Sequence, residues 1–213
     1  MSPRTPKQFQ DIREEKKTLI MDVALEHFAN DGYYRTTINH IARHAGISKG
    51  LMYNYFESKE SLLSEIIARS VSEVYTYFDI DKDGSLSEEE FEFFVKRVLY
   101  MLKEKQSFWR LYLQLMMQNE VRELLLKSFI NSDSFIQYSL LNKAELFVSE
   151  ILKTITDYFV RKKEVKGPDY DSSLEMNMFM ISLKGLAISY IYMDSTDDTN
   201  FDKTVNRIIE LYK

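Results

Sequence analysis

The chain has 213 residues, 45% of them hydrophobic, and a formal net charge of −5 at pH 7. That length and composition can bury a full core and suit one small and one medium domain. Because the sequence contains no cysteine, disulfides, thiolate zinc sites and cysteine nucleophiles are excluded. The polar start of the chain lacks the apolar core of a signal peptide, and the longest apolar stretch, 176–193, contains Lys184. We therefore expect a cytoplasmic protein that does not interact with membranes.

The charge is divided unevenly along the chain. Residues 1–60 carry nine Lys or Arg against eight Asp or Glu, a formal +1, whereas the rest carry nineteen against twenty-five, or −6. The amino-terminal part is thus only weakly basic. Five basic residues near its start could follow a nucleic-acid backbone or could belong to a frayed tail: Arg4, Lys7, Arg13, Lys16 and Lys17.

A first helix is predicted over residues 12–30, where apolar residues recur at helical spacing. Gly32 follows as a stop signal, since glycine commonly ends helices. The predicted core stripe of this helix is Leu19, Ile20, Val23, Ala24 and Phe28.

Two short helices follow, separated by a tight turn. Thr37 can cap the first, Ser48 can cap the second, and Gly46 can turn the chain because glycine adopts left-handed backbone angles without a Cβ clash. The first helix is expected to bury Ile38, Ile41, Ala42 and Ala45, and to leave out His40, Arg43 and His44. The second is expected to direct Met52, Tyr53 and Phe56 to the core, and Lys49, Gly50, Leu51, Asn54 and Tyr55 outward. Such a unit is typical of proteins that place one helix in the DNA major groove.

This segment closely resembles the DNA-binding domain of the TetR (tetracycline-repressor) family of bacterial transcription regulators. The matching residues are Thr36, Thr37, Ile41, Ala42, Ala45, Gly46, Ile47, Ser48, Lys49, Gly50, Tyr53, Phe56, Lys59, Leu62 and Leu63. Met52 stands where leucine is usual, and Tyr55 where histidine is common. The resemblance extends upstream to residue 12. It implies a homodimer that binds a two-fold related operator.

The resemblance also implies which residues meet DNA. Phosphates would be held by Thr37, Tyr55 and Lys59. Base edges would be faced by Lys49, Gly50, Leu51 and Asn54, beside Ser48 and Tyr53. Phosphate contacts position a protein on the duplex, and contacts to base edges specify the sequence. The alternative is a packing unit of small helices whose Lys49, Asn54 and Lys59 are merely solvated.

Beyond residue 57 the apolar spacing remains helical, and few residues interrupt it. Helices are predicted at 58–78, 87–104, 106–118, 119–129, 134–163, 171–193 and 200–212, with loops at 166–168 and 194–200. We therefore predict an all-α protein of two parts. They are a helix-turn-helix domain at 1–57 and a helical ligand-binding and dimerisation domain at 58–213.

Two features of the second part bear on function. The last two helices resemble the family's dimerisation pair, because their apolar residues exceed one internal stripe and Gly185 and Ala187 permit close approach. An aromatic and methionine cluster suits either a plain core or the cavity for a small-molecule effector that family members carry. It comprises Phe108, Trp109, Tyr112 and Met116. A repressor released by its effector is the expectation.

An acidic segment at 79–90 resembles an EF-hand calcium loop, which the family does not require. Its candidate Ca²⁺ ligands are Asp79, Asp81, Asp83, Ser85, Ser87 and Glu90. Gly84 lies where such a loop turns sharply, and Leu86 where it turns an apolar side chain inward. Ser87 and Glu90 also form a capping-box pattern, so the same residues could start a helix without a metal. Bound calcium could tilt the preceding helix and alter DNA binding.

Other function classes have weaker support. His40 and His44 share the i, i+4 spacing of a metal pair, but no HExxH motif or third ligand accompanies them, so we expect surface or phosphate-facing histidines. No nucleophile motif or phosphate-binding glycine loop occurs, so neither an enzyme nor a required cofactor is expected. A calcium sensor or buffer acting through protein partners is the remaining alternative. The single acidic loop and the intact helix-turn-helix argue against it.

Overall fold

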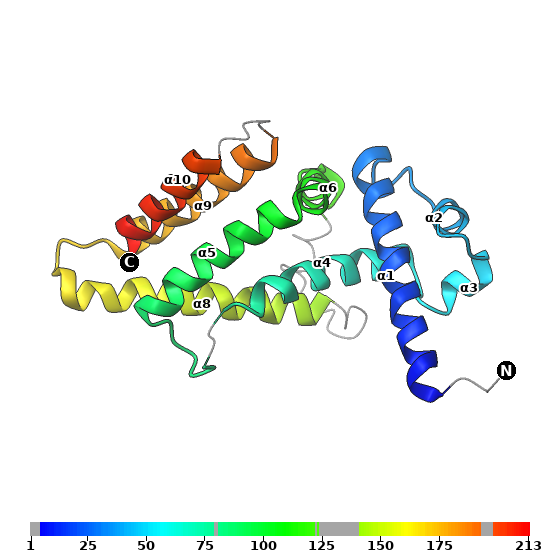
Figure 1. Cartoon of the computed structure of the whole chain (residues 1–213), viewed down its shortest axis with the longest axis horizontal. Helices are drawn as coiled ribbons and strands as arrows, with labels where there is room; N and C mark the ends of the chain where they lie inside the picture. Colours follow the sequence, from blue (N-terminus) through cyan, green and yellow to red (C-terminus); the bar gives the residue numbers. More distant parts are fainter. Residues whose placement is uncertain (1–4, 79–80, 122, 124–140, 193–197) are drawn as a thin grey trace. The chain divides into compact units, whose positions relative to one another are not determined.

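The computed structural model describes residues 5–78, 81–121, 123, 141–192 and 198–213. These residues form helices and turns with no strand, in agreement with the predicted all-α class. The helices, labelled in Figure 1, are α1 (Pro6–Asp31), α2 (Ile38–His44), α3 (Lys49–Tyr53), α4 (Lys59–Tyr75), α5 (Glu88–Glu104), α6 (Gln106–Met116), α8 (Leu141–Lys166), α9 (Ser172–Tyr192) and α10 (Asp198–Tyr212). In this part of the chain no helix is both long and apolar enough to cross a membrane.

Helix ends account for most differences from the prediction. α1 begins at Pro6, well before residue 12, because Thr5 and Gln8 form a capping box and proline needs no donor in a first turn. α4 ends at Tyr75 rather than at 78. Of the predicted helix at 119–129, residues 119–121 and 123 are described and are helical. The start of the predicted helix at 134–163 and most of the loop at 194–200 lie outside the described residues.

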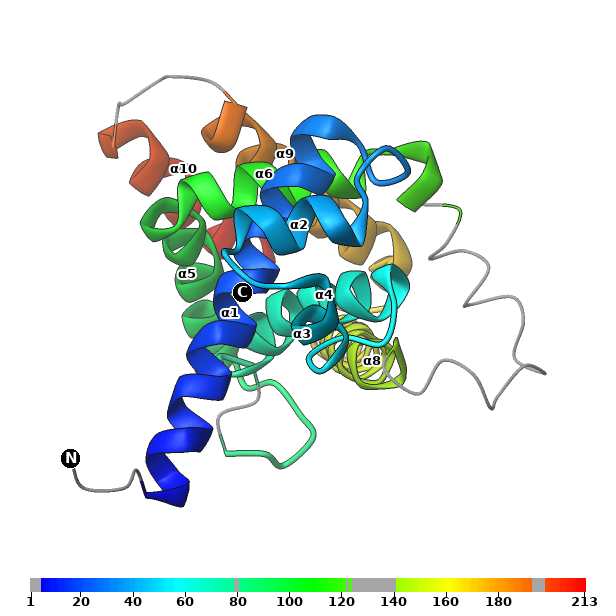
Figure 2. The same cartoon turned by 90° about the vertical axis from the view of Figure 1, so that its right-hand side faces the viewer.

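The chain forms two compact units, one of Met1–Arg69 and Leu111–Lys143 and the other of Ser70–Arg110 and Ala144–Lys213. The start of α4 is thus grouped with the amino-terminal helices, beyond the predicted boundary at residue 57. In the first unit α1 contacts α2, and α2 contacts α3 (Figure 2). The fully buried side chains there include Ile20, Ala24, Phe28, Ile41, Met52, Leu62 and Ile66.

One residue, Leu19, was wrongly placed in the predicted buried stripe of α1. Leu19 is 43% exposed, whereas Ile20, Ala24 and Phe28 are completely buried. These three residues are four positions apart and define the buried line of the helix, with Met21 and Leu25 beside it. Leu19 falls outside that line.

Aromatic rings form the core of the second unit, where α5, α9 and α10 contact one another. Phe91 of α5 stacks on Tyr158 of α8 with ring centroids 4.4 Å apart, and Phe179 of α9 lies 5.4 Å from Tyr212 of α10. Phe159 completes the cluster and is fully buried. Rings at these separations add directional contacts to the area they bury.

Candidate DNA-binding site

Side-chain caps define where α2 and α3 begin. The Thr37 Oγ accepts from the backbone N–H of His40 at 3.2 Å, and the Ser48 Oγ accepts from that of Leu51 at 3.1 Å. Gly46, between the helices, has a φ of +66°, a conformation that favours glycine. The turn is closed by the Ile47 N–H, which donates to the Ala42 carbonyl at 2.9 Å. These local interactions produce the predicted helix-turn-helix.

The outward face of α3 has the predicted composition. Met52 and Phe56 are buried, at 0% and 3% exposure, so they fix which side of this short helix faces the core. Exposed on the other side are Ser48, Lys49, Gly50, Leu51 and Asn54. Tyr53 was expected in the core but is 47% exposed. Neighbouring residues of a helix point about 100° apart, so Tyr53 cannot share the direction of Met52, and it lies beside the outward face.

Residues of α1 support α3 from the side. The Arg13 guanidinium donates to the Asn54 carbonyl at 3.1 Å and lies 5.1 Å from the centre of the Tyr55 ring. Lys17 forms an ion pair with Glu65 of α4 at 3.0 Å. Two of the five basic residues near the start of the chain therefore hold the domain together, and Arg4 lies outside the described residues.

Lys59, which the resemblance assigns to a phosphate, has neighbours within its own domain. Its Nζ donates to the carbonyl oxygens of Tyr33 and Thr36 at 2.9 and 3.1 Å, and it lies 4.4 Å from the centre of the Tyr33 ring. Partial burial lowers the pKa of this ammonium below its usual range. Lys59 thus holds the loop between α1 and α2, and its contact with phosphate stays a prediction.

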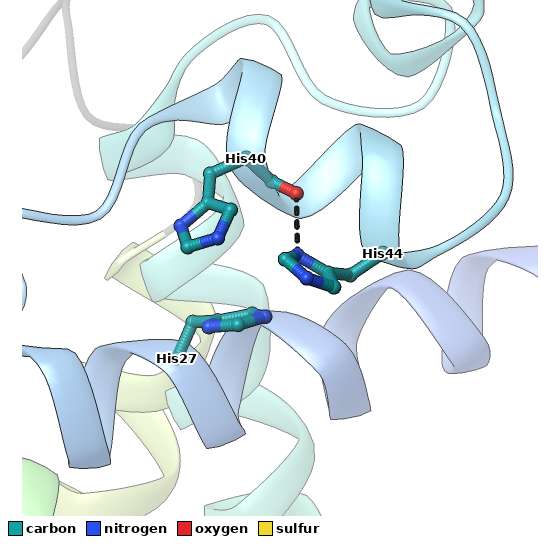
Figure 3. Close-up of side chains that lie close together, drawn as sticks. All are labelled: His27, His40 and His44. Carbon is teal, nitrogen blue, oxygen red and sulfur yellow. Dashed lines mark hydrogen bonds between the residues drawn. The ribbon is translucent and has the colours of Figure 1, made fainter.

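The three histidines form a cluster that the sequence argument missed. His27 of α1 lies against His40 and His44 of α2 (Figure 3), and each pair of ring centroids is 4.5 Å apart. The prediction of a histidine pair without a third candidate ligand was therefore wrong, because His27 lies beside the pair across the contact between α1 and α2. Partial burial, together with the nearby charges of His27 and His44, lowers the pKa of His40.

The acidic segment before α5 is a sequence of side-chain-stabilised turns. Asp81 Oδ1 accepts from the Asp83 N–H at 3.2 Å, and Asp83 Oδ1 accepts from the Ser85 N–H at 2.7 Å. Gly84 has a φ of +80°, as the sharp turn requires.

The end of this segment caps α5 and packs on α8. Ser87 and Glu90 form the capping box that the sequence allowed, with the Ser87 N–H donating to Glu90 at 3.0 Å. Leu86 turns inward at 2% exposure, as predicted, and its carbonyl accepts from Arg161 at 2.6 Å. Asp79 lies outside the described residues, and calcium binding stays a prediction.

The predicted effector residues all lie on α6. Trp109 is buried, and its ring meets that of Phe108 edge to face at 5.3 Å. Tyr112 and Met116 are partly buried, and burial raises the pKa of the Tyr112 hydroxyl to about 12. These positions suit a core as well as a cavity wall, so the effector site stays a prediction.

Similarity to a known family covers the helix-turn-helix. A family model described as bacterial regulatory proteins of the tetR family matches residues 20–66. Residues 20–66 belong to the TetR family. The match covers the second half of α1, all of α2 and α3, and the start of α4. This is also the part of the chain that was predicted most specifically.

Two curated relatives are transcriptional regulators of Bacillus subtilis rather than enzymes. YuxN is 41% identical over 63 residues, which make up 30% of this chain and 22% of the relative. YhgD is 30% identical over 105 residues, or 49% of this chain and 53% of the relative. The chain thus spans between about a fifth and a half of the length of these relatives.

The fold of this chain is also that of solved regulators. The structure of the regulator FadR from Bacillus subtilis in complex with stearoyl-CoA superimposes with a TM-score of 0.64. The two chains are 18% identical, and the superposition covers 92% of this chain and 97% of the FadR chain. At that identity the likeness concerns the fold alone.

Proposed function

We propose that this protein is a transcription regulator that binds a specific double-stranded operator through α3. The observation that carries the proposal is the exposed face of α3. Lys49, Gly50 and Asn54 are exposed there, and Met52 is buried on the other side of the helix. Lysine and asparagine side chains match donors and acceptors on base edges in the major groove, and glycine permits close backbone approach.

A second proposal is that two copies bind together through α9. Five large apolar side chains on this helix are between 38% and 62% exposed: Leu174, Met178, Ile181, Ile188 and Tyr192. Their spacings of four, three, seven and four residues place them along one stripe, and exposed Gly185 fills its gap. The buried Phe179 and Ile191 show that the opposite side already packs on the chain's own core. A self-complementary apolar stripe suits a two-fold homodimer.

We further propose that a small-molecule effector binds among the α6 residues and lowers operator affinity, so that the protein acts as a cytoplasmic repressor. The aromatic and methionine side chains there would receive an apolar part of the effector. A long-chain acyl-CoA is a practical first probe, because the FadR structure contains stearoyl-CoA.

Selection from random double-stranded DNA with the purified full-length protein tests the central proposal. Enrichment of a palindromic sequence is expected, because two copies related by a two-fold axis read two half-sites about 34 Å apart. Binding with no enriched sequence would reject specific recognition. Enrichment of one half-site without a repeat would reject the dimer and keep the recognition helix.

Calcium-linked regulation is a second candidate, supported by the turns that hold Asp81 and Asp83 at the start of α5. Ca²⁺ prefers several oxygen ligands on one flexible loop. Operator affinity is measured on metal-stripped protein with and without added Ca²⁺ at matched ionic strength, beside D83N as the control. A change in the unmodified protein that the control lacks supports a calcium-gated regulator. Equal affinities exclude the gating, and calcium binding without any operator binding supports the sensor alternative.

A further inference from the structure

All three histidines of the 213-residue chain meet at one place. His40 and His44 lie one turn apart on the same face of α2, beside the completely buried Ile41. His27 faces them from α1, and the three ring centroids form a triangle with sides of 4.5 Å (Figure 3).

The ring nitrogens are close to the spacing that a metal ion requires. One nitrogen from each ring lies within 4.8 Å of the other two. Zinc–nitrogen bonds of about 2.0–2.1 Å in a tetrahedron put the ligand nitrogens about 3.4 Å apart. Side-chain rotations would close that difference, and His44 is the exposed member of the three.

Two of the rings are also oriented as metal-bound histidines usually are. The Nδ1 of His27 is 2.6 Å from the Asp31 carboxylate, and the Nδ1 of His44 is 3.0 Å from the His40 carbonyl. If Nδ1 carries the hydrogen in each contact, the lone pair of Nε2 remains for a metal. A carboxylate or carbonyl partner on the other ring nitrogen is the usual support of a ligating histidine.

We propose that His27, His40 and His44 bind a divalent transition-metal ion, with Zn²⁺ as the expected ion. Imidazole nitrogens favour Zn²⁺, Ni²⁺ and Cu²⁺, whereas Ca²⁺ and Mg²⁺ favour oxygen, so this site differs in chemistry from the acidic segment at 81–90. The ion would join α1 to α2 and stabilise the helix-turn-helix, with its fourth position left to water. Metal binding here does not depend on the proposed operator recognition.

Co²⁺ absorption tests the site in the full-length protein, prepared without a histidine tag because a tag would bind the metal itself. Tetrahedral Co²⁺ absorbs visible light far more strongly than octahedral Co²⁺. We expect one strongly absorbing Co²⁺ per chain that Zn²⁺ displaces. H44Q should abolish the absorption, whereas D83N in the acidic segment should retain it. Equal absorption in H44Q, or its loss in D83N alone, would overturn the assignment.

Thermal unfolding supplies a second readout that does not depend on the spectrum. Excess Zn²⁺ should raise the melting temperature of the unmodified protein, because a ligand of the folded state alone stabilises it. H44Q and H40Q should lose that increase but unfold cooperatively without metal, which shows that they fold. If Zn²⁺ raises the melting temperature of these variants as much as that of the unmodified protein, the cluster is only a packing contact between imidazoles.

Discussion

The exposed faces of α3 and α9 differ in their chemistry. α3 presents Lys49, Gly50 and Asn54 around a single buried anchor, whereas α9 presents a stripe of apolar side chains opposite its buried Phe179. Exposed polar groups cost nothing in water and suit base edges, but exposed apolar area is stabilised when another surface covers it. The two faces therefore suit the two proposed partners, DNA for the first unit and a second copy of the chain for the second.

The largest expected effect comes from a charge in the α9 stripe. I181E would place a carboxylate in the proposed interface, where burial without a partner is costly. We expect a monomer by analytical ultracentrifugation. Operator affinity should fall by about 100-fold to 10,000-fold, because two linked half-sites gain that much from binding together.

The matched control for this substitution is V165E. Val165 is an apolar residue of α8 that is 87% exposed and lies outside the stripe. It should leave both the mass and the operator affinity unchanged. A dimeric I181E protein would show that the α9 stripe is not the interface, and would remove the contrast with α3.

A smaller effect is expected on the polar face. N54A removes one amide from the proposed base contacts but keeps the backbone carbonyl that Arg13 holds. Operator affinity should fall by about 1–3 kcal/mol, roughly 5- to 150-fold, with relaxed preference at one base position. Gel-shift titration against single-base operator variants measures both. K163A, which removes an exposed charge from α8, should change neither.

The helix-turn-helix was predictable from the sequence because its determinants are local. The caps at Thr37 and Ser48 and the turn at Gly46 act within three or four residues of their own positions. Tyr53 was misplaced because a five-residue helix has too few positions for the apolar period to choose a face. Tertiary packing of Met52 and Phe56 makes that choice.

The histidine cluster could not be read from spacing alone. His27 and His40 lie on different helices, and they meet only because Ala24 and Phe28 of α1 and Ile41 of α2 are buried in one core. The apolar excess of α9 was visible in the sequence. Which apolar residues of α9 remain exposed depends on which side of the helix packs against the core of the second unit. The sequence pattern of α9 does not specify that side.

A substitution of Lys59 tests whether this residue stabilises the first unit or contacts a DNA phosphate. In K59M the carbonyl oxygens of Tyr33 and Thr36 lose the hydrogen bonds from the Lys59 ammonium. The free energy of unfolding should fall by about 1–2 kcal/mol, a value reduced because the ammonium is partly exposed to solvent. The salt dependence of operator binding should keep its slope. A slope lower by about one would instead assign Lys59 to a phosphate, as the family resemblance implies.

The smallest effect concerns pH and the second unit. Hydrogen bonds from Lys213 and Lys96 lower the pKa of Glu92 from 4.5 to about 2. The pKa of Glu92 is lower in the folded protein than in the unfolded chain. The two lysine contacts of Glu92 therefore stabilise the fold above pH 4.5, and this contribution is lost as the pH falls from 4.5 toward 2. E92Q should therefore be less stable than the unmodified protein at neutral pH, by a small amount because the group is solvated. That difference should shrink in acid, as chemical denaturation at several pH values would show. Operator affinity at neutral pH should not change, because Glu92 lies in the second unit, whereas the α3 residues proposed to contact DNA lie in the first.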